Sequence, residues 1–233
     1  MTYTRKRGRI GWRTFKAEEV MEDFRKQYGS LPRLERSDLD ADPIAQFRSW
    51  FDHATESVPV DWFESNVMTL ATASKTGEVT ARIVLMKGLD SEGLVFYSNY
   101  DSKKGLQLAE NPRAAVVLFW PFLERQVRVE GEVERVSREM SERYFLSRPR
   151  GSQIGAAISR QSTTIQTAEE LEQRAEEMEQ AYDGQSIPLP EDWGGFRLKP
   201  VRFEFWQGRK NRLHVRFAYE RMGSTWNIVR LSP

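Results

Sequence analysis

The sequence predicts a mainly β protein in which helices surround an antiparallel sheet. Strand-like segments come in two runs, about five before a helical stretch and about three after it. Strands and helices therefore do not alternate strictly, which argues against a doubly wound parallel sheet. At least one connection, Lys75-Thr76-Gly77, is a short turn of the kind that joins antiparallel neighbours. The 233 residues suit one domain, expected over 21–233, with residues 1–20 as an N-terminal extension.

Helical patterns come first along the chain. Residues 16–28 have helical spacing, and a second helix is predicted after Asp42, which can cap it, with Pro43 at its first position. His53 lies off the apolar face of this helix and is expected at the surface. The apolar face consists of Ile44, Phe47, Trp50, Phe51, Ala54 and Val58.

The first run of strands begins at Val67. Residues 67–73 and 79–86 form a hairpin, 94–98 form a short strand, and 102–109 form a helix. Residues 114–120 are nearly all apolar, as in a strand buried on both faces. Residues 126–136 alternate, with Val127, Val129 and Val133 on one face.

The second half predicts helices and then three strands. Helices are expected over 137–146 and 167–182, the latter with Thr167 and Glu170 as a capping box. The apolar stripe of the latter contains Leu171, Ala175, Met178 and Tyr182. Strands follow over 196–206, 212–219 and near 226–231.

Composition excludes several classes of function. The chain has no cysteine and two histidines, which excludes thiol chemistry and argues against a histidine-rich metal centre, so no metal is expected. With 35 basic and 34 acidic residues, bulk charge gives no sign of nucleic-acid binding. No apolar run suits a membrane span or a secretion signal, so a cytoplasmic location is expected. The basic run Arg5–Arg9 is read as a solvated tail, with targeting or nucleic-acid binding as alternatives.

Cationic side chains provide the functional signals. Alternation would place Arg212, His214 and Arg216 on one strand face, where they repel one another unless an anion or acid lies among them. The alternative is a solvated edge strand. Near Arg148, Ser152 could cap a short helix and form a phosphate pocket, although a plain helical link with surface arginines also fits.

A further phosphate could bind where Arg82–Lys87 ends a strand and where Ser102, Lys103 and Lys104 start a helix. The two lysines could equally form an exposed helix face. Trp206 falls on the polar side of its strand and could cover a flat ligand or pack against a partner subunit. Two candidate phosphate sites with nearby aromatic residues indicate a phosphorylated cofactor and a phosphorylated substrate.

Taken together, these segments resemble the pyridoxamine/pyridoxine 5′-phosphate oxidase family from about Arg25 to the C-terminus. The resemblance rests on 82–88 (RIVLMKG), 96–99, 102–104, 124–131 (ERQVRVEG), 144–149, 152–156 (SQIGA), 161–162, 193–196 (WGGF), 204–208 (EFWQG), 212–214 (RLH) and the ending RLSP. It implies a split β-barrel homodimer with surrounding helices that binds FMN in clefts between its subunits. The small-molecule substrate would be pyridoxamine or pyridoxine 5′-phosphate, with no nucleic acid and no membrane involved.

The resemblance also implies residue roles. FMN contacts would be Arg82, Ile83, Val84, Leu85, Tyr97, Ser98, Lys103, Lys104, Gln126, Gln161, Trp206 and Arg216. Substrate contacts would be Lys87, Tyr144, Arg148 and Ser152 at the phosphate, with Arg212, Leu213 and His214 near the pyridine ring, and Arg25 and Tyr28 as additional contacts. Arg212 and His214 would be the catalytic residues.

The implied reaction oxidises the C4′ carbon to the aldehyde of pyridoxal 5′-phosphate, with O2 reduced to H2O2 and ammonia released from the amine substrate. Two departures from the family pattern are Val215 for the usual Asp and Lys103 for the usual Arg, which loses a two-pronged donor. A split-barrel oxidase with another substrate, such as a phenazine-pathway intermediate, and a non-catalytic protein that binds FMN or pyridoxal phosphate remain as alternatives.

Overall fold

The computed structural model describes residues 27–233, which form one nine-stranded sheet in which all strand pairs are antiparallel. The mainly β prediction is confirmed. The strands are β1 (Val67–Ala73), β2 (Val79–Leu85), β3 (Gly88–Asp90), β4 (Gly93–Asn99), β5 (Arg113–Trp120), β6 (Arg125–Arg135), β7 (Trp193–Gln207), β8 (Val215–Met222) and β9 (Thr225–Leu231). The helices are α1 (Pro43–Glu56), α2 (Lys103–Glu110), α3 (Arg138–Ser147), α4 (Arg150–Ile158) and α5 (Glu169–Ala181), with short 3-10 turns η2 (Arg36–Asp38), η3 (Pro121–Leu123) and η4 (Lys210–Arg212).

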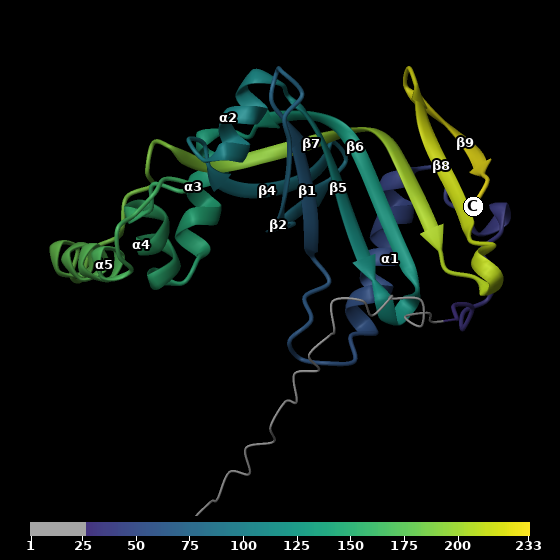
Figure 1. Ribbon diagram of the computed structural model, residues 1–233, viewed down its shortest axis with the longest axis horizontal. Coiled ribbons are helices and arrows are strands. Elements are labelled where there is room, and N and C mark those ends of the chain that lie inside the picture. Colours follow the sequence, from purple (N-terminus) through teal and green to yellow (C-terminus); the bar gives the residue numbers. More distant parts are fainter. Residues whose placement is uncertain (1–26) are drawn as a thin grey trace, which may run out of the picture.

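The sheet curls into a half-barrel in the order β2-β1-β5-β6-β7-β4-β3. The long strand β7 pairs with two different strands along one edge, since residues 193–198 pair with β4 and residues 202–207 pair with β8. Helices α3, α4 and α5 gather near the start of β7, whereas β8 and β9 lie at the opposite end of the molecule (Figure 1). The first and last residues of β7 therefore lie in different parts of the protomer, one near the helices α3–α5 and the other near β8 and β9.

Local sequence explains the element boundaries. The Asp42 side chain accepts a hydrogen bond from the Ile44 amide at 3.0 Å, so the predicted cap of α1 is confirmed, including Pro43 in its first turn. The His53 side chain is exposed, as predicted, and contacts Arg125 at 3.0 Å. Ser102 caps α2 by accepting from the Gly105 amide.

The main core fills the inside of the curled sheet and packs against α1. Alternation along β6 buries Val127, Val129 and Val133, as predicted. Large fully buried side chains such as Phe47 on α1 and Trp120 on β5 belong to this core. A smaller cluster around Phe145, Ile154, Ile187 and Trp193 holds α3 and α4 against the start of β7.

Four local predictions are wrong. Strand β5 is not buried on both faces, because Phe119 is 44% exposed and only alternate side chains of the strand are buried. Strand β8 begins at Val215 and not at Arg212, because Asn211 and Arg212 have φ angles of 56° and 60°, outside the extended region. Helix α5 has no side-chain cap, so Thr167 and Glu170 form no capping box. Ser152 does not cap α4, because this helix already begins at Arg150.

Some predictions fall outside the described residues or concern what those residues lack. The basic run Arg5–Arg9, most of the expected helix 16–28, and Arg25 lie outside residues 27–233. Within residues 27–233, no helix has the length and apolar character needed to cross a membrane. In the same part of the chain, acidic and histidine side chains form no group that could hold a metal ion.

Candidate functional site

One cavity of about 500 Å3 opens between the end of β2, strand β4 and helices α2, α3 and α4. It brings together twelve of the residues singled out in the sequence, from segments up to 79 positions apart. These twelve are Arg82, Ile83, Val84, Leu85, Lys87, Tyr97, Ser98, Lys104, Tyr144, Arg148, Ser152 and Gln161. Asn99, Gly155, Ala156, Ser159 and Trp193 complete the lining.

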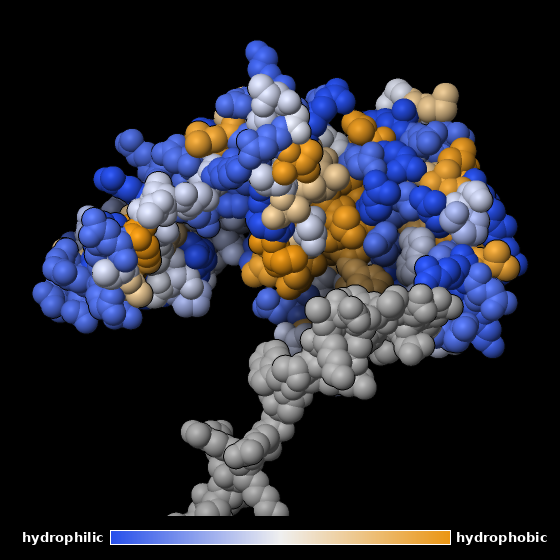
Figure 2. All heavy atoms as spheres, viewed as in Figure 1, coloured by the Kyte–Doolittle hydropathy of each residue, from blue (hydrophilic) through white to orange (hydrophobic). Residues whose placement is uncertain are grey.

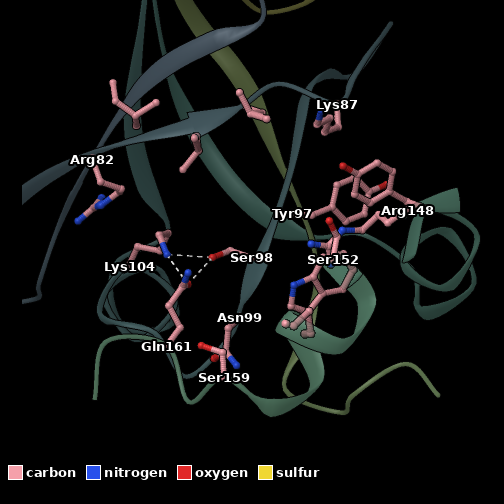
Figure 3. Close-up of a pocket in the computed structure, with 17 residues that line it drawn as sticks. Arg82, Lys87, Tyr97, Ser98, Asn99, Lys104, Arg148, Ser152, Ser159 and Gln161 are labelled. Carbon is pink, nitrogen blue, oxygen red and sulfur yellow. Dashed lines mark hydrogen bonds between the residues drawn. The ribbon is translucent and has the colours of Figure 1, made fainter. Parts of the chain in front are cut away.

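Lys104 is the centre of a polar cluster on one side of this cavity. Its Nζ atom donates to Gln161 Oε1 at 2.7 Å and to Ser98 Oγ at 2.9 Å, as Figure 3 shows. Burial and the nearby positive charge of Arg82 lower the pKa of Lys104 to about 8. The described partners of the protonated lysine are all neutral, so a bound anion would supply a compensating negative charge.

Arg82 projects from β2 into the same side of the cavity (Figure 3). Its Nη1 atom donates to the Leu70 carbonyl at 3.1 Å and to Thr72 Oγ1 at 2.7 Å, which fixes the guanidinium in place. Burial lowers its pKa, yet an arginine stays charged at neutral pH. Arg82 and Lys104 together form a fixed cationic cluster.

Arg148 belongs to a second cluster on the other side of the cavity, with Lys87, Tyr97 and Ser152 (Figure 3). Its guanidinium lies 5.0 Å from the ring centroid of Trp193. The Nη1 atom of Arg148 is buried and has no hydrogen-bond acceptor among the described residues. A buried donor without an acceptor is costly, so this side of the cavity also suits an anion.

Three aromatic rings form a parallel stack beside Arg148. Tyr97 and Tyr144 are 3.9 Å apart at 20°, and Tyr97 and Trp193 are 5.6 Å apart at 13°. Burial raises the pKa of both tyrosines, so their hydroxyls stay protonated at neutral pH and can donate hydrogen bonds. The stack gives the cavity a flat apolar wall.

No aspartate or glutamate is among the described residues that line this cavity. Its four cations, Arg82, Lys87, Lys104 and Arg148, form two separate groups. A ligand with two anionic ends, or two ligands with one anionic end each, would match this distribution of charge.

The remaining candidate residues lie elsewhere. Trp206, His214 and Tyr28 form an aromatic cluster at the far end of β7, with the Trp206 and His214 rings 4.6 Å apart. His214 Nδ1 accepts from the Arg209 amide at 3.1 Å, which places the proton of the neutral ring on Nε2. Burial, assisted by the charge of Arg212, lowers the pKa of His214.

Arg216 has a partner that the sequence reading missed. It pairs with Glu204 on the neighbouring strand, whose side chain is only 3% exposed and also lies within 3.5 Å of Arg128 and Arg202. Glu204 occurs between two phenylalanines in a strand, and an acid in such a segment is the signal that could have identified it. Gln126 lies opposite Trp206 in the register of β6 and β7, so it joins this second region.

The cavity lining does not include Val215, Leu213 or Lys103. Val215 is 3% exposed within the main core, so it does not contribute to the cationic surface. Leu213 is 68% exposed beside Arg212, which is also exposed. Lys103 does not line the cavity, because its Nζ atom pairs with Glu78 Oε1 at 2.6 Å.

The curled antiparallel sheet with helices around one end, and a cavity that carries two cationic groups, define a split-barrel protein with sites for anionic ligands. Comparisons with known proteins identify which family of that class it is. Residues 58–182 match the family described as pyridoxamine 5′-phosphate oxidase, and residues 193–233 match the C-terminal dimerisation region of pyridoxine 5′-phosphate oxidase. The chain therefore belongs to the pyridoxamine/pyridoxine 5′-phosphate oxidase family, and the resemblance seen in the sequence is confirmed.

Individual relatives agree with this assignment. A pyridoxine/pyridoxamine 5′-phosphate oxidase of Rhodopirellula baltica is 50% identical over 218 residues, which cover 92% of this chain and 97% of that protein. One from Cupriavidus pinatubonensis is 50% identical over 213 residues, covering 91% and 98%. Among solved structures, PhzG from Burkholderia lata, in complex with tetrahydrophenazine-1-carboxylic acid, has a TM-score of 0.81 at 28% identity, covering 88% of this chain and all of that one.

Proposed function

We propose that this chain is an FMN-dependent oxidase that converts pyridoxamine or pyridoxine 5′-phosphate to pyridoxal 5′-phosphate and works as a homodimer. The observation that carries the proposal is one cavity with two separate cationic groups, whose lining among residues 27–233 contains no carboxylate. One group would hold the phosphate of the cofactor, and the other the phosphate of the substrate. FMN and the substrate each carry one phosphate and one flat ring system, so both fit this arrangement.

The residues of the cavity fit FMN on the structure's own terms. Lys104 and Arg82 repel one another, none of the described lining residues is an acid, and a phosphate dianion between the two cations would offset their repulsion. Ser98 and Gln161, already bonded to Lys104, supply further polar atoms. When bound, the flavin would accept two electrons from the substrate and pass them to O2.

Arg148 would hold the substrate phosphate, because its unpaired Nη1 atom is buried next to Ser152 and Lys87 in the cavity lining. The hydroxyls of Tyr144 and Ser152 would add hydrogen bonds. Binding energy from this non-reacting end would fix the pyridine ring against the flavin. The products would be the aldehyde, H2O2 and, from the amine substrate, ammonia.

The second region, with Arg212, His214, Trp206, Gln126 and Arg216, would complete the site from the partner subunit. Strand β7 runs 13 residues from Trp193, in the cavity, to Trp206, and an extended strand rises about 3.3 Å per residue. The two regions are thus separated by about 40 Å of extended strand, and they lie at opposite ends of β7 in the protomer. A two-fold axis can place the far end of one protomer's β7 over the other's cavity.

Exposed apolar side chains support a covered sheet surface. Val79 and Ile83 on β2 and Phe119 on β5 are between 44% and 69% exposed. Figure 2 shows apolar atoms gathered over β1, β2 and β5 in the middle of the molecule. Such an area on a protomer is typical of a subunit interface.

The test is to purify the chain, record its flavin absorbance after FMN is supplied, and measure H2O2 formation with pyridoxine 5′-phosphate in air. We expect yellow protein that forms H2O2 with pyridoxine 5′-phosphate. Pyridoxine without the phosphate should be a poor substrate. A chain that binds FMN but prefers an unphosphorylated tricyclic substrate would instead favour the phenazine-type oxidase that the fold of PhzG suggests. A chain that binds no FMN would overturn the proposal.

A further inference from the structure

Lys103 forms an ion pair outside the cavity that its neighbour Lys104 enters. Lys103 Nζ lies 2.6 Å from Glu78 Oε1, whereas Lys104 Nζ bonds with Ser98 and Gln161 in the cavity lining. Two consecutive lysines at the start of α2 thus have different partners. Lys103 pairs with the acid Glu78, whereas Lys104 bonds with the neutral side chains of Ser98 and Gln161 beside Arg82.

Glu78 lies on the same side of the hairpin as the cavity's cationic cluster. Residues 78, 80 and 82 alternate with the outward side chains of β2, so Glu78, Thr80 and Arg82 share a face. Gln107 of α2 connects this face to the helix, because its Nε2 atom donates to the Glu78 carbonyl at 3.0 Å and its Oε1 atom accepts from Thr80 at 2.7 Å. These two hydrogen bonds hold residues 78 and 80 against α2, so the Glu78 carboxylate stays near the first turn of this helix.

The ion pair itself can open at little cost. The side chains of Lys103 and Glu78 are 55% and 62% exposed, and exposed pairs of this kind contribute little free energy. A lysine has a flexible four-carbon stem, so Lys103 can turn from Glu78 toward an anion held by Lys104 and Arg82. The hydrogen bond from Lys103 and its charge lower the pKa of Glu78, which is a carboxylate at neutral pH.

We propose that Glu78 competes with the cofactor phosphate for Lys103 and thereby sets the affinity of the site for phosphorylated flavin. The inference rests on the proposed function, since it needs FMN as the ligand. Lys103 cannot bind Glu78 at 2.6 Å and also reach into the cavity, so one contact excludes the other. FMN binding must then break the Lys103–Glu78 pair, and the free energy of that pair is subtracted from the free energy of FMN binding.

The experiment is to titrate the apoprotein with FMN and with riboflavin, following the quenching of flavin fluorescence, in the wild-type chain and in Glu78→Gln. We expect Glu78→Gln to bind FMN roughly two- to fivefold more tightly, which is the range that one exposed ion pair allows. Riboflavin lacks the phosphate, so its affinity should be the same in both proteins.

Two further variants locate the effect. Glu132→Gln removes one negative charge from another exposed pair, with Arg113 at 3.6 Å, and should leave FMN affinity unchanged. In a Lys103→Ala background, where no lysine is left to release, Glu78→Gln should gain much less than it does in the wild type. Thermal unfolding of each apoprotein checks that the fold is intact.

Each outcome is decisive. If Glu78→Gln binds FMN no more tightly than the wild type, or if riboflavin gains as much as FMN, the competition does not exist. A gain that survives unchanged in the Lys103→Ala background also overturns it, because the effect then does not pass through Lys103. A wild-type chain that binds no FMN fails at the earlier step, and the proposed function falls together with this inference.

Discussion

Arg216 directs both its Nε and Nη2 atoms at a single oxygen of the buried Glu204, each at 2.9 Å. The other oxygen of Glu204 lies 3.5 Å from Arg128 and from Arg202. One carboxylate thus holds three arginines across β6, β7 and β8. The sequence indicated that the cations around residue 216 need an acid or anion among them. That acid is Glu204 on the neighbouring strand, whereas Val215 packs into the core.

Glu204→Gln should therefore destabilise the protein by about 2–3 kcal/mol at pH 7. This is below the usual cost of breaking a fully buried pair, because the three arginines are 25–39% exposed and can reach water. Urea unfolding measures the loss. Glu132→Gln, which breaks an exposed pair with Arg113, should change stability by less than about 0.5 kcal/mol. Equal losses in the two variants would show that Glu204 has no special role.

The stabilisation from Glu204 should also depend on pH. Burial alone would raise the pKa of Glu204, but the hydrogen bond and charge of Arg216, with the charges of Arg128 and Arg202, lower it overall. A lowered pKa in the folded state adds stability above the ordinary pKa of about 4.3, and that stability is lost as pH falls through the lower folded value. Urea curves at pH 7 and in acid should show the difference between wild type and Glu204→Gln shrinking on acidification. A constant difference would contradict this.

FMN affinity should fall as pH rises from 7 to 9, because Lys104 has a pKa of about 8 in the free protein. Above this value the apoprotein must take up a proton to bind the phosphate, so the dissociation constant should approach a tenfold increase per pH unit. The phosphate itself is fully ionised above about pH 7 and adds no slope. Lys104→Arg keeps its charge throughout and should give a flatter profile. Fluorescence titration measures both, and an equal slope in the two proteins would exclude Lys104 as the titrating group.

Arg148→Met should raise the KM for pyridoxine 5′-phosphate by roughly 10- to 100-fold, since about 1.5–3 kcal/mol comes from a hydrogen bond to a charged group. Flavin content should stay at the wild-type level, because Arg82 and Lys104 lie on the other side of the cavity. Arg143→Met, an exposed arginine of α3 paired with Glu139, is the matched control and should behave as wild type. Loss of flavin in Arg148→Met would mean that the two cationic groups do not have separate ligands.

Local pattern predicted most of the strands and the cations of the cavity, whereas Tyr97, Ser98, Tyr144 and Gln161 came from the family resemblance. Alternation placed Val127 and Val129 in the core, and the strand-end segment 82–87 and the helix start at 102–104 supplied the cations Arg82, Lys87 and Lys104 of the cavity. Glu204 could not be placed this way, because its three arginines come from three strands whose register is set by long-range pairing.

Backbone conformation limited the prediction around Arg212. Alternation assumes extended residues, but Asn211 and Arg212 adopt positive φ angles that no side-chain pattern signals. The partner of Lys103 was missed because Glu78 is 25 positions away, and local pattern does not show which distant residues come into contact. The separation between the cavity residues and the region around Arg212 follows from the path of β7. The sequence predicts β7 as a long strand but does not show that its first part pairs with β4 and its last part with β8.

A mixture of two impaired variants, assayed with pyridoxine 5′-phosphate well below the wild-type KM, tests whether each site draws residues from both subunits. Arg148→Met impairs the cavity, and Arg212→Ala impairs the far end of β7, where activity should drop while the protein stays yellow. If each site combines Arg148 of one protomer with Arg212 of the other, a hybrid dimer contains one site with both changes and one intact site. Random assembly makes half of the dimers hybrids, so coexpression should restore about a quarter of wild-type activity. Arg148→Met coexpressed with itself under a second tag is the control and should restore none. If both arginines served a site within one protomer, no hybrid would have an intact site, and the mixture would stay as slow as its parents.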